Sequence, residues 1–218
     1  MSSVIFQSGA VWANSELSMV NECLLAIGEA PYIDGTIVES LPVGTDGEIA
    51  KRIVRSTMLE VQQKGWYFNT EYDFKLYPDV NDFVAVPPNV LRLDFGNSGN
   101  KHRYIIQGSS IYDRKDQTFK IKETLTADVV WLEDYSDLSI EAYAYITLRS
   151  ARKFQQRAIG SGEIDQFTIR DEADALTDLQ RVQMQTQDYK LQNHRVNTRI
   201  HNGYLVRGLY GNTDRRNF

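Results

Sequence analysis

LSMVNECLLAIGEAP (Leu17–Pro31) and EVQQKGWYFNTE (Glu60–Glu71) are the two stretches that decide the fold of this chain. Each is predicted to be a helix that ends at a glycine, Gly28 in the first and Gly65 in the second, because glycine readily adopts the left-handed conformation that terminates helices. Apolar side chains recur at helical spacing through the first stretch: Leu17, Val20, Leu24 and Ile27. That spacing predicts one buried helix face.

Capping residues and breaks in periodicity place the other helices. Ser15 is a candidate N-cap for the first helix, and the pair Thr45 and Glu48 has the capping-box spacing that opens the second. A third helix is predicted to open around 136–138 and to stop near 160–162. A fourth, longer helix is predicted from about Glu163 to Leu191. The aromatics 66–68 are expected to leave the second helix in extended form, because bulky rings favour pleated backbone.

Between about Thr70 and Tyr135 the hydrophobic pattern changes to period two, and prolines and glycines punctuate it. This pattern is typical of short strands, and strands so closely spaced predict an antiparallel sheet or small barrel. Tyr72, Phe74 and Leu76 alternate with charged residues in the first candidate strand. The further candidates are 83–86, 90–93, 104–106, 110–112, 119–121 and 128–132.

The sequence therefore predicts an α+β fold: a bundle of about four helices, the last one long, with an inserted antiparallel β-rich domain and an extended C-terminal tail. The predicted parts are 1–69 (first helices of the bundle), 70–135 (β-rich insertion), 136–192 (last helices of the bundle) and 193–218 (basic tail).

Charge is unevenly distributed along the 218 residues, whose net charge is -5. Residues 193–218 hold five arginines and one aspartate, a local balance of +4, which leaves about -9 for the rest. An acidic body does not suit general binding to nucleic acid, whereas the basic tail fits either DNA or an acidic protein surface. The only cysteine, Cys23, lies in an apolar stretch and is expected to be a buried, inert thiol. Neither a signal peptide nor a membrane span is expected.

No catalytic, cofactor or metal site is predicted. The three histidines lack metal-ligand spacing, and phosphate-loop, dinucleotide and nucleophile-elbow motifs are missing from the sequence. Carboxylates are the only catalytic candidates. Glu71 and Asp73 lie two apart on a predicted strand and so would face the same side. A glycosidase needs two such groups, one with a raised pKa, so glycan hydrolysis is kept as the alternative activity, with Trp66 or Trp131 as a sugar platform. The plainer interpretation of both tryptophans is that they anchor a core.

The order of motifs resembles the tail tubular protein A family, the head-to-tail adaptors of short-tailed bacteriophages. The pattern L-x-x-V-N-x-x-L-x-x-I-G-E-x-P begins at Leu17, and G-W-x-F-N follows at Gly65, with Trp66 and Phe68 as its structural aromatics. L-x-P-D at 76–79, V-P-x-N-V-L-R at 86–92 and Y-D-R at 112–114 continue the likeness. The resemblance covers about residues 15–190.

The resemblance implies a structural virion protein of the tail, assembled in the host cytoplasm. From the residues themselves, no cofactor and no membrane partner are expected. About twelve copies would form a ring joining the portal to the nozzle, tail tubular protein B, and would help to seat the tail fibres. Genomic DNA would pass through the bore without specific binding. The basic tail is the candidate portal or ring interface, through Arg195, Arg199, Arg207, Arg215 and Arg216. A third class, a DNA-binding accessory factor that uses the same tail, would show salt-dependent DNA binding.

Overall fold

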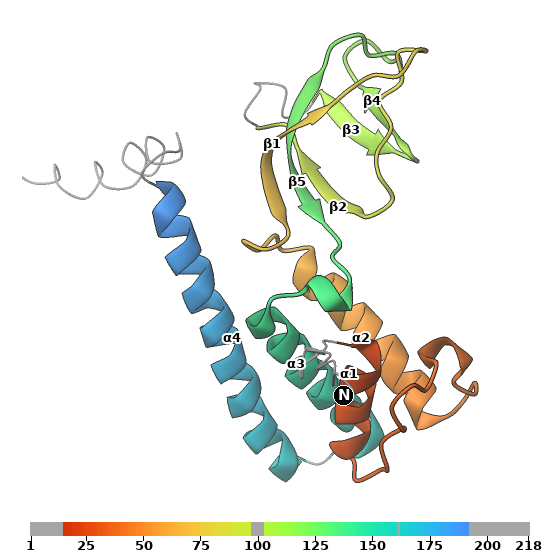
Figure 1. Ribbon diagram of the computed structural model, residues 1–218, viewed down its shortest axis with the longest axis vertical. Helices are drawn as coiled ribbons and strands as arrows, with labels where there is room; N and C mark the ends of the chain where they lie inside the picture. The colour runs from red at the N-terminus through yellow and green to blue at the C-terminus, as the bar shows by residue number, and fades with distance from the viewer. Residues whose placement is uncertain (1–14, 97–102, 161, 192–218) are drawn as a thin grey trace, which may run out of the picture. The chain divides into compact units, whose positions relative to one another are not determined.

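The computed structural model describes residues 15–96, 103–160 and 162–191, which form four α-helices and five β-strands (Figure 1). The helices are α1 (Glu16–Leu25), α2 (Asp46–Gln62), α3 (Ile140–Ala158) and α4 (Gly162–Leu191). The strands are β1 (Thr70–Leu76), β2 (Val90–Asp94), β3 (Tyr104–Gln107), β4 (Ser110–Asp113) and β5 (Leu125–Trp131). The mixed α+β class, the four helices and the greater length of the last one are as the sequence predicts.

The predicted caps hold the first two helices. The Ser15 hydroxyl accepts a hydrogen bond from the Ser18 amide at 3.1 Å, and the Thr45 hydroxyl accepts from the Glu48 amide at 3.4 Å. Only one half of the predicted capping box forms in this way, because the Glu48 carboxylate pairs with Arg52 one turn further on. α3 starts later than predicted: a 3-10 turn occupies Tyr135–Asp137, and Ser139 is the N-cap.

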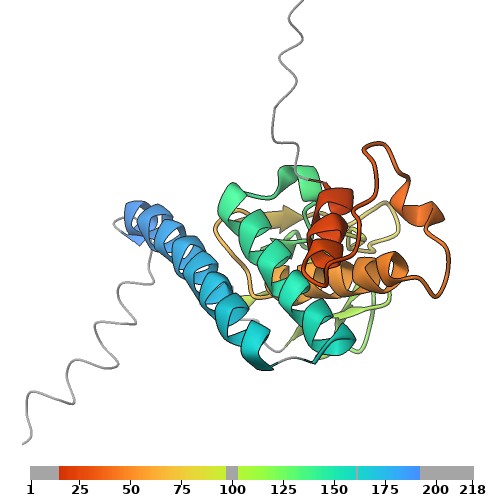
Figure 2. The same cartoon turned by 90° about the horizontal axis from the view of Figure 1, so that it is seen from below.

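A hydrophobic core joins α1, α2 and α3, which lie side by side in the view of Figure 2. The predicted stripe of α1 lies in or against this core. Two large apolar residues, Ile49 in α2 and Ile140 in α3, lie at helical spacing with buried neighbours but are themselves exposed. α4 adds Ala175 and Leu179 to the core, with Leu176 packed against it.

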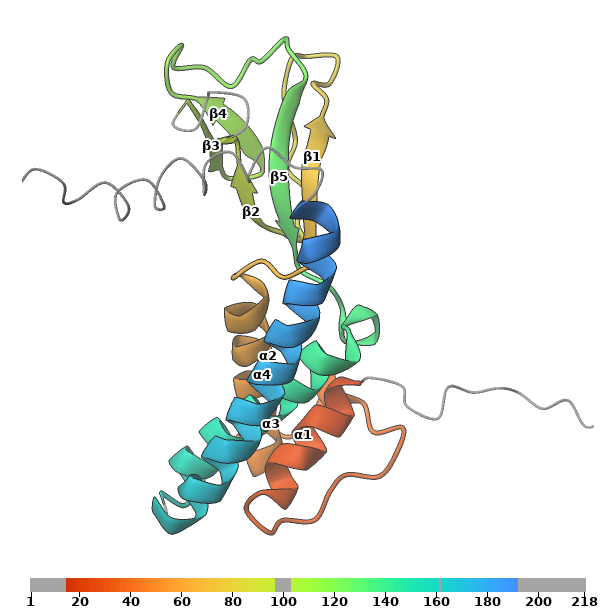
Figure 3. The ribbon, with the colours of Figure 1, turned by 90° about the vertical axis from the view of Figure 1, so that its left-hand side faces the viewer.

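All five described strands lie between α2 and α3 in chain order, in two antiparallel sheets. β1, β5 and β2 form one sheet in that order, and β3 and β4 form a hairpin (Figures 1 and 3). A second hydrophobic core lies among these strands: Leu76, Val84, Phe95, Tyr104, Ile111, Ile121, Leu125 and Ala127. The segments 83–86 and 119–121 were expected to be strands, but within them only Phe83, Ala85 and Lys120 pair, as isolated bridges.

The chain divides into two compact units, Met1–Leu179 and Gln180–Phe218. The first unit contains α1 to α3, α4 up to Leu179 and all the described strands. The finer division at 69/70 and 135/136, with a β-rich insertion and a C-terminal tail, stays a prediction.

Candidate functional site

The turn that follows α2 is held by hydrogen bonds to both the helix and the strands. Gly65, with φ +79°, ends α2, and a Cβ there would come within 3.0 Å of Arg92 and 3.1 Å of Val130. Only glycine fits that conformation and that close approach. Residues 66–69 then form a turn in which the Asn69 amide donates to the Trp66 carbonyl at 3.2 Å. The expectation that the aromatics leave in extended form is therefore wrong, because Asn69 folds the chain back on itself.

Trp66 anchors this turn in the helical core. Its side chain is buried, at 8% exposed, and its indole Nε1 donates a hydrogen bond to the carbonyl of Val61 at 2.8 Å. The polar N–H of the ring therefore has a partner inside the core. Phe68 is half-buried and meets Tyr67 edge to face, with ring centroids 5.6 Å apart. Both family aromatics therefore pack against the helices, which supports a structural role for them.

Two buried side-chain amides bind the strand ends to α2. Asn69 is 1% exposed; its Oδ1 accepts from the Trp66 amide at 2.8 Å. Its Nδ2 donates to the carbonyls of Gln62 at 3.0 Å and Trp131 at 2.7 Å. Gln62, also buried, donates to the Glu133 carbonyl at 3.0 Å and accepts from the Glu133 amide at 2.8 Å. We call this set of four residues, Gln62, Asn69, Trp131 and Glu133, the amide joint. It fixes both chain crossings between helices and strands.

A depression of about 410 Å³ lies over the amide joint, lined by Phe68, Asn69, Thr70, Glu71, Asn89, Trp131 and Glu133. Glu71 accepts a hydrogen bond from the Trp131 indole at 3.3 Å. Burial raises the pKa of Glu133, and the nearby carboxylates Asp137 and Asp134 add to the shift. Asp73 is not among the lining residues. It has φ +56° and lies in a bulge of β1, which interrupts the alternation that placed it on the same side as Glu71.

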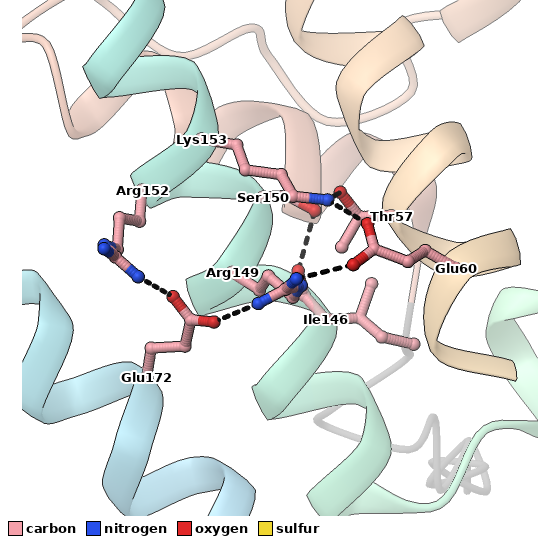
Figure 4. A network of polar contacts seen from close by, with 8 residues as sticks. All are labelled: Thr57, Glu60, Ile146, Arg149, Ser150, Arg152, Lys153 and Glu172. Carbon is pink, nitrogen blue, oxygen red and sulfur yellow. Dashed lines mark hydrogen bonds and ion pairs between the residues drawn. The ribbon is translucent and has the colours of Figure 1, made fainter. Parts of the chain in front are cut away.

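An ion-pair network fastens α4 to α2 and α3 (Figure 4). The Arg149 guanidinium lies between two carboxylates, 2.5 Å from Glu60 in α2 and 2.5 Å from Glu172 in α4. Arg152 pairs with Glu172 at 2.7 Å, and Lys153 pairs with Glu60. Lys153 and then Arg149 lower the pKa of Glu60 to about 2. Glu172 in α4 thus pairs with two arginines of α3. Arg149 pairs with carboxylates of both α2 and α4, and so connects three helices.

The geometry supports a structural molecule: among the described residues its best-formed polar clusters join elements to each other. A comparison with known families agrees, because the family model described as Tail tubular protein matches residues 17–189. The chain belongs to the Tail tubular protein family. No curated protein matches it. This tail tubular protein is accordingly a structural component of a phage tail.

Several predicted features of this tail tubular protein can now be placed. Cys23 is buried, and burial, helped by Glu22, raises the pKa of its thiol to about 12, which makes it inert as expected. The five tail arginines and the three histidines lie outside the described residues. Within the described residues, side chains that could hold a metal do not gather anywhere, and no helix is long and apolar enough to cross a membrane.

Sequence reasoning missed the roles of Gln62, Asn69 and Arg149. Asn69 does stand in the quoted G-W-x-F-N pattern, so a signal for it existed. Its partners at 62 and 131 lie 7 and 62 residues away, however, and a single sequence does not show which pairs meet.

Proposed function

We propose that this tail tubular protein forms a homo-oligomeric adaptor ring of about twelve copies between the portal and the nozzle protein. The observation that carries the proposal is the family match, which extends over residues 17–189 and so includes both the helical core and all the described strands. Assembly takes place in the host cytoplasm, and the finished ring also seats the tail fibres.

Exposed apolar side chains support an assembling role. Ile33, which is 82% exposed, Ile37 and Val43 follow α1 on one surface segment. Tyr77 and Val80, the latter 98% exposed, follow β1 on another. Exposed apolar side chains mark surfaces that become buried in an assembly when they gather into a patch, and these two segments are the candidates for such patches.

The acidic body and basic tail give the ring two electrostatic roles. A negatively charged bore lets the genome slide, because it offers no cations to hold the DNA phosphates. The arginines of 193–218 carry the local +4 and are suited to an acidic surface of the portal or of a neighbouring subunit.

Mass by light scattering, with the portal absent and then present, tests the ring. A particle of about a dozen copies on the portal is the expected result, and negative-stain images would show its symmetry. A protein that stays monomeric and ignores the portal would exclude the adaptor role. Salt-dependent binding of DNA by the isolated protein would instead favour the accessory-factor role.

A tail-borne glycan hydrolase is the second candidate function. One observation favours it: Glu71, Trp131 and Glu133 line the same depression. The pKa of Glu133 is raised, as the pKa of a general acid must be. The test is release of reducing sugar from host-surface polysaccharide by the whole protein. Loss of release in Glu71→Gln with retention in Asp73→Asn would establish the activity at this depression, whereas the opposite pattern would assign it to Asp73. If the unaltered protein releases no reducing sugar, the hydrolase function is excluded.

A further inference from the structure

A groove of about 460 Å³ runs between α3 and α4, on residues that none of the polar clusters above uses. α3 contributes Ile140, Glu141, Ala144 and Leu148, and α4 contributes Asp171, Asp174, Ala175 and Asp178. Ile140, Ala144 and Leu148 are spaced four apart and so form one apolar stripe on α3. Ile140 is 78% exposed and Leu148 is also exposed, so the stripe is open to an incoming segment.

The rim of the groove is acidic. Glu141 stands on the α3 side, and Asp171 and Asp174 are exposed on the α4 side. The described lining contains no lysine or arginine. The nearest cations of α3, Arg149 and Arg152, are committed to Glu60 and Glu172 in the ion-pair network. A segment that fits this groove therefore needs apolar side chains for the floor and cations for the rim.

We propose that residues 193–218 of a neighbouring copy occupy this groove and link subunits head to tail. The segment carries +4, against the carboxylates of the rim. Within it Arg195 and Arg199 are four apart, and Val196 and Ile200 are four apart beside them. Cations and apolar side chains thus recur at the spacing of the stripe on α3.

The length of the segment allows this contact. The 27 residues after Leu191 can extend up to about 90 Å, far enough to leave their own subunit. A contact in which one surface meets a different surface of the next copy is heterologous, and such contacts form a ring when the rotation between copies closes. The inference rests on the proposed ring and names the contact that holds it together.

Disulfide trapping between two differently marked full-length chains tests the contact. One chain carries Leu148→Cys in the groove and the other carries Val196→Cys in the tail, and the two are mixed and mildly oxidised. The native Cys23 is buried and does not interfere. A matched control replaces Leu148→Cys by Arg157→Cys, because Arg157 is exposed on α3 nine residues further on, half a turn around the helix. The expected result is a covalent two-chain product with Leu148→Cys and only background with Arg157→Cys.

Charge reversal tests the chemistry of the contact. Asp171→Lys with Asp174→Lys in the groove chain, or Arg195→Glu with Arg199→Glu in the tail chain, should each lower the yield of linked product about tenfold, since like charges then meet. Both reversals together should restore it. Circular dichroism confirms that each variant is folded.

Two outcomes would overturn the inference. The first concerns a further variant that carries both Leu148→Cys and Val196→Cys in one chain: it would form only the disulfide within that chain and no two-chain product. The second is equal linking of the groove cysteine, Leu148→Cys, and the control cysteine, Arg157→Cys. Light scattering on the same samples distinguishes failure of the tail contact from failure of the proposed adaptor ring. A portal-bound ring without the trapped link overturns the tail contact alone, whereas no ring under any condition overturns the adaptor role.

Discussion

Asn69→Ala should be one of the most destabilising single substitutions in the described chain. The asparagine side chain makes three hydrogen bonds, to the Trp66 amide and to the carbonyls of Gln62 and Trp131, and it is 1% exposed. Alanine satisfies none of these groups. Leaving a buried donor or acceptor unpaired costs about 1–3 kcal/mol, and the Trp131 carbonyl is only partly buried, so the three losses together amount to about 3–4 kcal/mol.

The assay is urea unfolding of full-length protein, followed by far-ultraviolet circular dichroism. Asn89→Ala is the matched control, because Asn89 lines the same depression but is exposed, and its loss should stay within about 0.5 kcal/mol. A fall of less than about 1 kcal/mol for Asn69→Ala would refute the reasoning, since it would mean that the freed groups find other partners at little cost. Equal losses in the two variants would refute it too.

Three further predictions follow from named contacts. Trp66→Ala should lower the free energy of unfolding, measured in urea, by about 3–5 kcal/mol. A near-neutral change would instead favour a ligand-binding role for Trp66. The folded state holds the pKa of Glu60 at about 2 against an ordinary 4.5, so its contribution is complete above pH 4.5 and is lost as pH falls toward 2. Glu60→Gln should flatten the thermal stability profile in that window, and an unchanged profile would contradict the assignment. Removal of residues 193–218 should leave the fold intact, as judged by circular dichroism, but impair portal docking. Normal virion assembly by the truncated protein would exclude the tail from docking.

Helices were the more predictable part of this fold because their signals are local. Ser15 and Thr45 cap within three residues of themselves, and Gly28 and Gly65 stop their helices by their own backbone conformation, with φ +82° and +79°. The apolar stripe of α1 repeats every turn, so a short window of sequence contains the whole pattern.

The predictions for the turn at 66–69 and for strands at 83–86 and 119–121 failed because distant partners decide these structures. Three adjacent aromatics favour extended backbone, but the Asn69 side chain closes a turn around Trp66. Phe83 and Lys120 have strand-like neighbours, yet they meet only at one bridge, since no longer register between their segments forms. Ile140 fits the periodicity of α3 but is the first residue of that helix and lines the groove, where the described residues leave it 78% exposed.

The candidate site was less predictable than the fold for the same reason. Arg149 is one of several cations on α3, and only the packing of α2 and α4 distinguishes it, through Glu60 and Glu172. The carboxylate pair chosen from the sequence, Glu71 and Asp73, relied on regular alternation, but β1 has a bulge between Glu71 and Phe74. Glu71 instead lines a depression together with Glu133.

The amide joint and the ion-pair network of this tail tubular protein differ in the conditions that weaken them. The amide joint holds helices and strands together through neutral hydrogen-bonding groups that are buried or partly buried, and salt screens such hydrogen bonds little. The link between α4 and α3 relies on ion pairs whose members are partly exposed, together with the few apolar side chains that α4 buries. Rising ionic strength weakens exposed pairs first, so α4 should be the element whose attachment responds to conditions while the joint stays fixed. The proposed docking groove has α4 as one wall. A subunit contact there would stabilise the ion-paired attachment of α4 to α3 as the ring forms.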